Sequence, residues 1–275
     1  ASVFNGDITN DGVIVGGGIT TGLHITAGTM TGDIVNNNLL QASSNALHVQ
    51  IGTLNGEITN TGVIEAFIPG DAAVRLEVGN GTTFTNTDGG LILGNVFFSG
   101  TTSAYDFVGE NGGIEGSLVG QTDFFSGKNN DTITVQNGTH YFVDGGGEGG
   151  NHTASNFSSF TVEDGGFALM GATTEGDPSA SSSGYAFSNV DTLHVNNGGT
   201  LYIDKSTTLN VDSSYTQQAG GTLEFYLKAP GGSGFSSLTG VQVAGPGDYG
   251  QIIVTGGPAA LNGTIAGFLD PAFAS

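Results

Sequence analysis

The sequence contains no cysteine, which excludes thiolate nucleophiles, iron–sulfur clusters, Cys-ligated zinc and disulfides. Basic residues are also scarce: Lys and Arg total 4 against 25 Asp and Glu, which gives a formal net charge of −21. A chain of this charge repels phosphate backbones and anionic lipid head groups, and no basic cluster offsets the repulsion locally. Nucleic acid is therefore not an expected partner.

Long apolar runs and helical patterns are missing as well. The sequence has no run of about 18 apolar residues, which is the length that spans a bilayer as a helix. It also has no long segment in which apolar residues recur at the spacing of a surface helix. The start at Ala1 has neither the basic segment nor the apolar segment of a signal peptide, as expected for a mature or trimmed chain. Proline is rare, with 6 residues, and the glycines follow no Gly-X-Y period, which excludes collagen.

Glycine is abundant, with 50 of 275 residues, and Asn, Thr and Ser alternate with Val, Ile, Leu and Phe along the chain. Polar and apolar residues that alternate between Gly- and Asn-rich turns are typical of short strands. Hydrophobic residues make up 37% of the chain, which is too many for a disordered acidic tail. The composition predicts a folded, all-β protein.

Two motifs recur in the same phase in the N-terminal part of the chain. The second motif lies between copies of the first, so both belong to one repeating unit. The first motif reads FNGDITNDGVIV from Phe4, MTGDIVNNNLLQ from Met30 and LNGEITNTGVIE from Leu54, at offsets of 26 and 24 residues. The second reads GLHITAG from Gly22, ALHVQIG from Ala46 and, more weakly, AVRLEVG from Ala73.

The same period continues farther along the chain, although the residue types at the repeated positions differ. A unit of about 25 residues cannot bury its own apolar side chains, so successive coils must stack. Stacking in phase places Ile8, Ile34 and Ile58 in one inward column and predicts a right-handed parallel β-helix with a C-terminal capping region. A β-sandwich also offers many short strands, but it does not explain repeats in phase. The later copies are DTITVQNGTHYFV from Asp131, SSFTVEDGGFALM from Ser158 and DTLHVNNGGTLYI from Asp191.

The C-terminal quarter contains two linked blocks, YTQQAGGTLEFYL from Tyr215 to Leu227 and YGQIIVTGGPAALNGTIAGFL from Tyr249 to Leu269. Together they resemble the autochaperone or junction region that closes the passenger domains of type V secreted autotransporters. The sequence departs from that pattern at Gly250, where the family often has an acidic residue, and at Gly257 and Pro258. The residues at the family's positions are Tyr215, Gln217, Gly220, Gly221, Thr222, Leu223, Tyr249, Gln251, Val254, Gly256, Leu261 and Gly263.

This resemblance implies an autotransporter passenger domain, with β-helix coils over residues 1–212 and autochaperone-like coils and a cap over 213–275. It also implies a signal peptide before Ala1 and, after Ser275, an outer-membrane β-barrel that tethers the native protein. The implied location is the bacterial cell surface or the medium. The alternating strands of the C-terminal segment predict that it is the stable end of the rod, from which folding proceeds.

No string in the sequence marks a catalytic site. Serine-protease autotransporters have Gly-Asp-Ser-Gly around the nucleophile and the esterase class has Gly-Asp-Ser, and neither string occurs here. His24 and His48 occupy the same position in successive coils, and Arg75 occupies it in a weaker third copy. This repetition favours a stacked structural ladder over catalysis or metal binding.

The other histidines are interpreted in the same way. His194 falls in the register of Thr134 and Thr161, so it belongs to another outward row. His140 and His152 flank the stretch VDGGGEGGN and are predicted to be solvated loop residues.

Acidic residues recur at the coil period, at Asp7, Asp33 and Glu57. The repetition predicts a charged stripe and not a unique catalytic pair, although a hydrolase that uses two carboxylates stays open as an alternative. A polysaccharide lyase needs a basic residue beside clustered carboxylates and is disfavoured by the scarcity of bases. The chain has four in all: Arg75, Lys128, Lys205 and Lys228.

Two glycine-containing stretches partly resemble known ligand-binding motifs, one for calcium and one for phosphate. GKNNDTITV from Gly127 resembles a fragment of calcium-binding β-roll repeats, but those repeats come in tandem copies that are missing here. GGGEGG from Gly145 is not followed by a strand-to-helix unit, so it is not a phosphate loop. No catalytic, cofactor-binding or metal-binding residue is predicted.

The sequence therefore predicts a non-enzymatic passenger that acts in adhesion or self-association and binds a protein, a glycan or another copy of itself. Ladders of Asn, Thr and Ser along the rod would supply the hydrogen bonds. Specialised surfaces are expected at Gly171 to Gly184 and at Ser99 to Gln121, which breaks the repeat. The alternative is a glycan hydrolase on the same scaffold, which requires a concave site with a non-repeating carboxylate pair.

Overall fold

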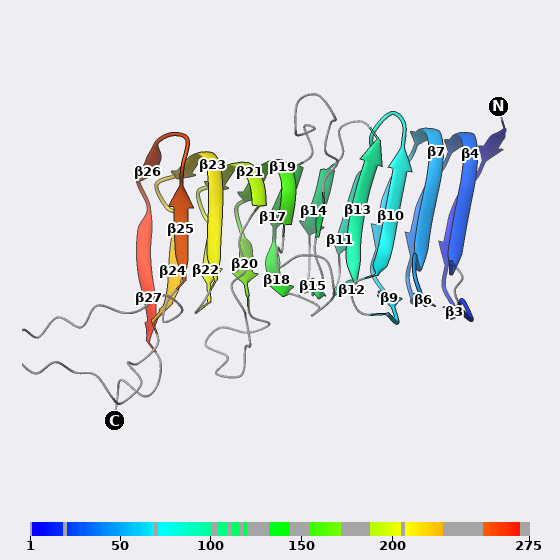
Figure 1. The fold of residues 1–275 in the computed structure, drawn as a ribbon, viewed down its shortest axis with the longest axis horizontal. Helices are drawn as coiled ribbons and strands as arrows, with labels where there is room; N and C mark the ends of the chain where they lie inside the picture. The colour runs from blue at the N-terminus through cyan, green and yellow to red at the C-terminus, as the bar shows by residue number, and fades with distance from the viewer. Residues whose placement is uncertain are drawn as a thin grey trace, which may run out of the picture.

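The computed structural model is a stack of strand-built coils, in which the strands follow one another in chain order along the long axis (Figure 1). Within the described part of the chain all regular secondary structure is β-strand. No helix there is long and apolar enough to cross a membrane. The structure describes residues 2–18, 21–68, 71–87, 89–100, 104–108, 112–115, 118–119, 132–143, 154–171, 188–204, 207–227 and 250–269.

Each coil adds one strand to each of three columns, and strands of successive coils pair in parallel. Three long strands, β19, β21 and β23, bend through the corner between the first and second columns, which joins these columns into one 17-stranded sheet. The third column is a separate ten-stranded sheet. Between the terminal coils, inward-facing apolar residues are therefore covered by the same positions of the coils on either side.

The strands are as follows. The first column contains β1 (Val3–Asn5), β4 (Leu23–Thr31), β7 (Leu47–Asn55), β10 (Ala72–Val78), β13 (Asn95–Gly100), β16 (Leu118–Val119), the first parts of β19 (Ala154–Val162), β21 (Ser188–Val195) and β23 (Thr208–Gln217), and β25 (Gln251–Val254). The second contains β2 (Ile8–Asn10), β5 (Ile34–Asn36), β8 (Ile58–Asn60), β11 (Thr83–Thr87), β14 (Ala104–Val108), β17 (Thr132–Gln136), the second parts of β19, β21 and β23, and β26 (Ala259–Leu261). The third contains β3 (Ile14–Val15), β6 (Leu39–Ala42), β9 (Val63–Ala66), β12 (Leu91–Leu93), β15 (Gly112–Glu115), β18 (Gly138–Val143), β20 (Gly166–Met170), β22 (Thr200–Ile203), β24 (Thr222–Leu227) and β27 (Thr264–Leu269).

The register between coils confirms the predicted parallel β-helix. Ile8 pairs with Ile34, which pairs with Ile58, and both of the latter are buried. Farther along, the three valines of the later repeats also stack, and all three are fully buried: Val135, Val162 and Val195. The β-sandwich alternative is excluded because stacked coils, and not two facing sheets, bury the apolar side chains.

Glycine recurs at the corner between the first two columns because the coils approach too closely there for a side chain. A Cβ atom on Gly56 would lie 2.6 Å from the carbonyl carbon of Gly32, and one on Gly32 would lie 2.5 Å from the carbonyl carbon of Gly6. Gly32 also has a φ of 132°, which L side chains rarely adopt. The glycines in the first repeated motif are therefore required by the stacking distance.

A ladder of buried asparagines closes the turn after the second column in the N-terminal coils. Asn10 donates to Asn36, Asn36 donates to Asn60, and Asn60 donates to Asn86, each through Nδ2 to Oδ1 at 2.7 Å. All four side chains are at least nine-tenths buried. Because each amide both donates and accepts along the column, the buried polar groups are satisfied without water.

The segment from Ser99 to Gln121 continues the coils where it is described. Its strands β14, β15 and β16 lie in the second, third and first columns, respectively, and pair with the coils on both sides. The expectation that this segment breaks the repeat is therefore wrong for these strands, because they keep the pairing register of the neighbouring coils although the residues differ. The predicted boundary between residues 212 and 213 lies within β23.

Candidate functional site

The second column presents an outward row of small hydroxyl side chains. Along a strand, the residue next to an inward-facing residue faces outward. Parallel pairing then aligns the outward-facing residues at the same position of successive coils. The described row runs through Thr9, Val35, Thr59, Thr85, Asp106, Thr134, Thr161, His194, Thr216 and Ala260. Where side-chain exposure is described, these threonines are half-buried or exposed.

A second hydroxyl row runs beside the first, two residues earlier on each strand. Its members in the later coils are Thr83, Thr132, Ser159, Thr192 and Ser214, with Ala104 between the first two. Coils lie about 4.8 Å apart and positions two apart on a strand lie about 7 Å apart, so hydroxyls form a regular two-row grid. We call these two rows the hydroxyl face.

The structure brings together the predicted histidine ladder on the outward side of the first column. His24 pairs with His48, which pairs with Arg75, and the two imidazoles stack in parallel with centroids 4.4 Å apart. The Arg75 guanidinium continues the column over the ring of Phe97, 5.3 Å from its centroid. Thr26 hydrogen-bonds His24 through Oγ1 and Nε2 at 3.1 Å.

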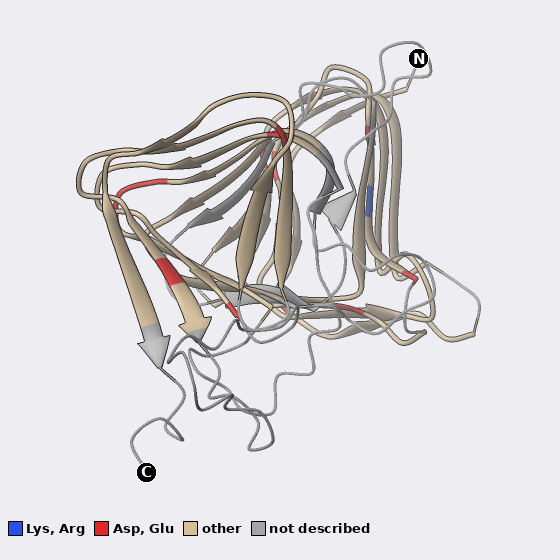
Figure 2. Cartoon of the chain, turned by 60° about the vertical axis from the view of Figure 1, so that its left-hand side comes forward, with Lys and Arg blue, Asp and Glu red and all other residues tan. Residues whose placement is uncertain are grey.

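Glu77 ties this ladder to the next outward row. One of its carboxylate oxygens lies 3.4 Å from Nε2 of His48, and the other accepts a hydrogen bond from Nε2 of Gln50 at 2.9 Å. Arg75 donates through Nε to Asn45 at 3.2 Å. In the described part of the chain it is the only Lys or Arg, visible as the single blue segment in Figure 2. These contacts bind side chains to one another across coils.

His140 contradicts the sequence interpretation. It lies in β18 and is fully buried, so it is not a solvated loop residue. Its neighbours in the inward column are Gly112 and Ala168, whose small size leaves room for an imidazole ring. Nε2 lies 3.0 Å from the carbonyl oxygen of Asn137 and therefore donates to it. Burial lowers the pKa of His140 below its ordinary value, so the ring is neutral at pH 7.

This burial predicts a pH dependence of stability. A histidine whose pKa is lower in the folded state stabilises the fold above its unfolded pKa of about 6.5, and that contribution is lost as the pH falls below this value. We expect the melting temperature of the wild type to fall more between pH 7 and pH 5 than that of His140→Gln, as followed by circular dichroism. The outward-facing His194→Gln is the control, and equal pH slopes for all three proteins would contradict the expectation.

The repeated carboxylates form the predicted stripe and hold the coils together. Oδ1 of Asp7 accepts a hydrogen bond from the backbone N–H of Asp33, and Oδ1 of Asp33 accepts one from the N–H of Glu57, both at 2.9 Å. All three residues are exposed. Their shared contacts indicate a structural role, and a hydrolase would need a carboxylate pair that does not repeat.

No group of three or more His, Asp or Glu is close enough to hold a metal ion in the ranges that the structure describes. Several residues and segments singled out in the sequence lie outside those ranges: His152, Lys128, Lys205, Lys228, the start of the fragment from Gly127, the stretch from Gly145, and residues 172–184 of the expected surface loop.

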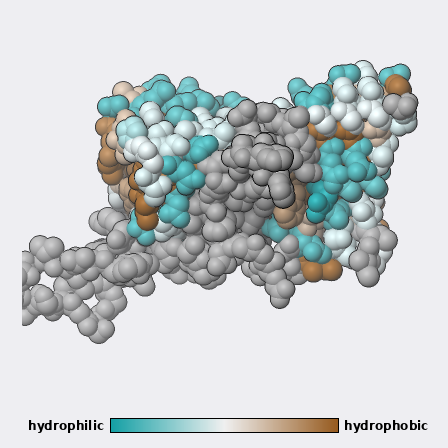
Figure 3. Space-filling model, turned by 45° about the horizontal axis from the view of Figure 1, so that its top comes forward, coloured by the Kyte–Doolittle hydropathy of each residue, from teal (hydrophilic) through white to brown (hydrophobic). Residues whose placement is uncertain are grey.

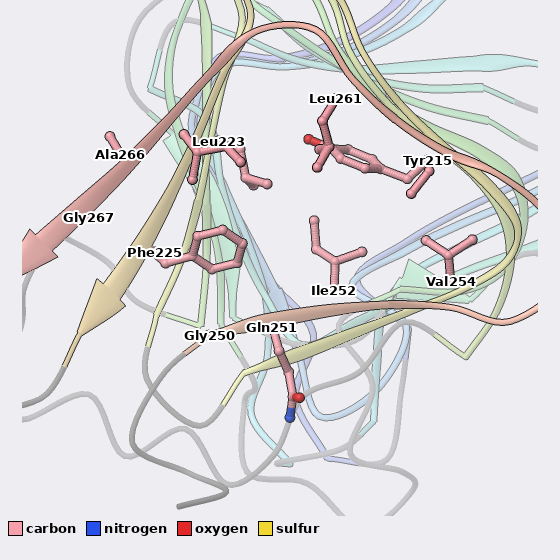
Figure 4. A pocket seen from close by; sticks show the side chains of 12 residues that line it. Tyr215, Leu223, Phe225, Gly250, Gln251, Ile252, Val254, Leu261, Ala266 and Gly267 are labelled. Carbon is pink, nitrogen blue, oxygen red and sulfur yellow. The ribbon is translucent and has the colours of Figure 1, made fainter. Parts of the chain in front are cut away.

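The C-terminal end of the stack contains an apolar hollow of about 580 Å³ (Figure 4). Phe225, Leu223 and Ile252 point into it, and Tyr215 lies across its inner side. The Tyr215 side chain is almost fully buried and its hydroxyl has no hydrogen-bond partner. Burial raises the pKa of this phenol well above its ordinary value, so it stays protonated. Figure 3 shows hydrophobic atoms on the surface at this end.

Comparison with protein-family models, with curated proteins and with solved structures finds no match to this chain. The functional assignment therefore depends on the geometry of the chain itself and on the sequence resemblance.

The sequence interpretation missed the two-row arrangement of the hydroxyl face. A signal was present in tripeptides of the form Thr/Ser-apolar-Thr, at Thr83–Thr85, Thr132–Thr134, Ser159–Thr161 and Ser214–Thr216. These tripeptides stand in different sequence contexts, so only the observed register shows that they are aligned.

Proposed function

We propose that this chain is the surface-exposed passenger of an autotransporter and that it acts by adhesion or self-association, not by catalysis. The β-helix fold and the C-terminal sequence blocks support the assignment to this class. In that setting the native protein is secreted or displayed on the bacterial surface, tethered by an outer-membrane barrel. Its partner is a protein or glycan ligand, or another copy of the same chain.

The hydroxyl face supports this proposal most directly. Along it, a ligand with hydrogen-bonding groups at regular intervals meets an equivalent hydroxyl on coil after coil. A single hydrogen bond contributes only about 1 kcal/mol, but a row of them sums to a specific affinity. Glycan chains and the hydroxyl face of a second rod both offer such repeated groups. Acidic residues stand in the first row at Asp106 and, in the first three coils, in the second row at Asp7, Asp33 and Glu57, so the acidity of the chain opposes binding least on the later coils.

The test is to screen the purified chain against a glycan array, extracellular matrix proteins and itself. Binding to any of these without change in the ligand supports an adhesive role. Hydrolysis of a bound glycan, detected as new reducing ends, would overturn the proposal in favour of the hydrolase alternative.

Removing hydroxyls from the face tests its role directly. We expect the combined variant Thr59→Val, Thr85→Val, Thr134→Val and Thr161→Val to weaken binding of ligands found in the screen at least tenfold. Stability should be unchanged, because valine keeps the branched shape and favours strands. His24→Asn and His48→Asn, on the first column, are the controls and should bind like the wild type. Undiminished binding by the valine variant would show that the ligand contacts another surface.

A further inference from the structure

A single histidine interrupts the hydroxyl face in the later coils. His194 lies in β21 between Thr161 of β19 and Thr216 of β23, and these three strands follow one another along the stack (Figure 1). Its neighbours in the chain, Leu193 and Val195, are fully buried, so its own half-buried side chain faces outward. An imidazole ring therefore stands between two small hydroxyl side chains on the outer surface.

The fold makes no use of the His194 ring. His24 and His48 stack on each other, and His140 donates to a backbone carbonyl inside the core. Within the part of the chain that the structure describes, His194 is the one histidine whose ring makes no hydrogen bond, ion pair or ring contact with the protein. A neutral imidazole has one donor and one acceptor nitrogen, and here both are available to a ligand.

Hydroxyls on the two neighbouring coils are available as well. Thr161 and Thr216 flank His194 in its own row, and Ser159 and Ser214 lie in the second row of the same two coils. Among the described residues, none of these four hydroxyls is hydrogen-bonded to another protein group. We call the imidazole and the four hydroxyls the His194 patch.

The charge around the His194 patch is negative. Directly after β21, Asn196 donates through Nδ2 to Oε2 of Glu163 at 2.9 Å. The described residues of these coils, 154–171, 188–204 and 207–227, include no Lys or Arg. An anionic ligand would therefore be repelled here, whereas a neutral ligand would not.

The His194 patch has no apolar side chain that could anchor a protein. The exposed large apolar residues of the described chain all lie before residue 69 or after residue 252. Protein interfaces are centred on buried apolar or aromatic anchors. A sugar instead offers hydroxyls that both donate and accept, and a C–H face that packs against a flat ring. The available groups of the patch therefore suit a glycan better than a protein.

The spacing of the coils suits an extended glycan. Neighbouring coils lie about 4.8 Å apart, which is close to the length of one sugar residue in a β-1,4-linked chain. A chain that lies along the row would place successive sugars at Thr161, His194 and Thr216.

We propose that the His194 patch binds a neutral β-1,4-linked glycan, with His194 as the anchoring residue. Its ring nitrogens would donate to and accept from sugar hydroxyls, while the flanking hydroxyls bind the sugars on either side. This inference rests on the proposed function, because it names the ligand class of the hydroxyl face and the coils that bind it.

The experiment measures binding of defined hexasaccharides to the full chain by isothermal titration calorimetry. The neutral probes are β-1,4-linked mannohexaose, cellohexaose and xylohexaose. The anionic probe is hexamannuronate, which differs from mannohexaose by a carboxylate at C6 of every sugar. We expect at least one neutral probe to bind, and hexamannuronate to bind at least tenfold more weakly.

Substitutions place the binding on the later coils. His194→Ala should weaken binding of the neutral probe at least tenfold, because it removes both the ring and its nitrogens. His24→Ala is the matched control, since it removes the same ring from the first column. Thr161→Val with Thr216→Val should also weaken binding, whereas Thr9→Val with Thr59→Val, in the same row of the early coils, should not. Circular dichroism confirms that each variant is folded.

The outcomes separate this inference from the proposed function. If His194→Ala binds the neutral probes like the wild type while the combined threonine-to-valine variant does not, this inference is overturned and an adhesive hydroxyl face stands. If no neutral probe binds but a protein or a second copy of the chain does, the ligand class is wrong and adhesion stands. New reducing ends from a bound neutral probe would instead contradict the proposed function, and weaker binding by His194→Ala would still support the site.

Discussion

Gly56→Ala is expected to lower the free energy of unfolding by about 3 kcal/mol. The new methyl group would lie against the backbone carbonyl of Gly32 in the preceding coil, closer than van der Waals contact allows. Two backbone hydrogen bonds flank this position, from Gly32 to Asn55 at 3.1 Å and from Ile34 to Glu57 at 2.9 Å. The coils must separate to admit the methyl group, so these bonds lengthen. Urea unfolding followed by circular dichroism measures the loss.

Gly12→Ala is the matched control. A Cβ atom on Gly12 meets nothing within 4 Å, and its backbone conformation is one that alanine adopts readily. This variant should be as stable as the wild type or slightly more stable, because alanine restricts the unfolded chain. Equal destabilisation by the two substitutions would mean that loss of glycine flexibility, and not the distance between coils, determines the effect.

Asn60→Asp is expected to have the largest effect, a loss of about 4 kcal/mol at pH 7. Nδ2 of Asn60 donates to the carbonyl of Gly62 at 3.0 Å and to Asn86 at 2.7 Å. Aspartate replaces this donor with a charged acceptor that faces two other acceptors in a fully buried site. Protonation of the new carboxyl restores one donor, so the difference from the wild type should shrink between pH 7 and pH 4. Urea unfolding at both pH values measures it.

Asn55→Asp controls for the added charge, because Asn55 is exposed five residues earlier on the chain. This substitution should change the free energy of unfolding by less than about 1 kcal/mol. If Asn60→Asp were equally mild, the asparagine ladder would not be essential to the stacking. A deficit of Asn60→Asp that stayed constant with pH would show that the cost does not come from a buried charge.

Both predictions depend on the stacking distance, and this is also what makes the hydroxyl face regular. Coils that separate at Gly56 would shift neighbouring Thr59 relative to Val35, its partner in the preceding coil, and so relative to Thr9 in the coil before that. Glycine and asparagine at the corners therefore contribute to binding indirectly, by holding outward threonines in line.

Much of the architecture could be predicted because the repeats are in phase. When Ile8, Ile34 and Ile58 recur beside the same Gly-acidic pair, stacking them buries all three and leaves the corners free of side chains, so one register is favoured. The same logic correctly placed His24 over His48 and His194 beside Thr161. Repetition fixes the register because each coil offers its neighbour the same surface.

His140 shows where local pattern was insufficient. Its strand follows the turn at Asn137, and the nearby glycines suggested a loop. The ring is accommodated inside because the adjacent coils supply Gly112 and Ala168 at the paired positions. Neither of these residues is close to His140 in the sequence, so space for the side chain becomes apparent only when the coils are stacked.

The sequence by itself determined the β-helix, the inward isoleucine column and the histidine ladder, because these depend on repetition at a fixed period. Only the tertiary structure decided how dissimilar coils align, since threonines in unrelated contexts join one face through pairing across coils. It also decided that Ala259 lies beside Tyr215 and Gly267 beside Phe225, which leaves the end hollow. That hollow depends on a difference in size between paired residues of separate coils, and such pairs are not defined until the register is known.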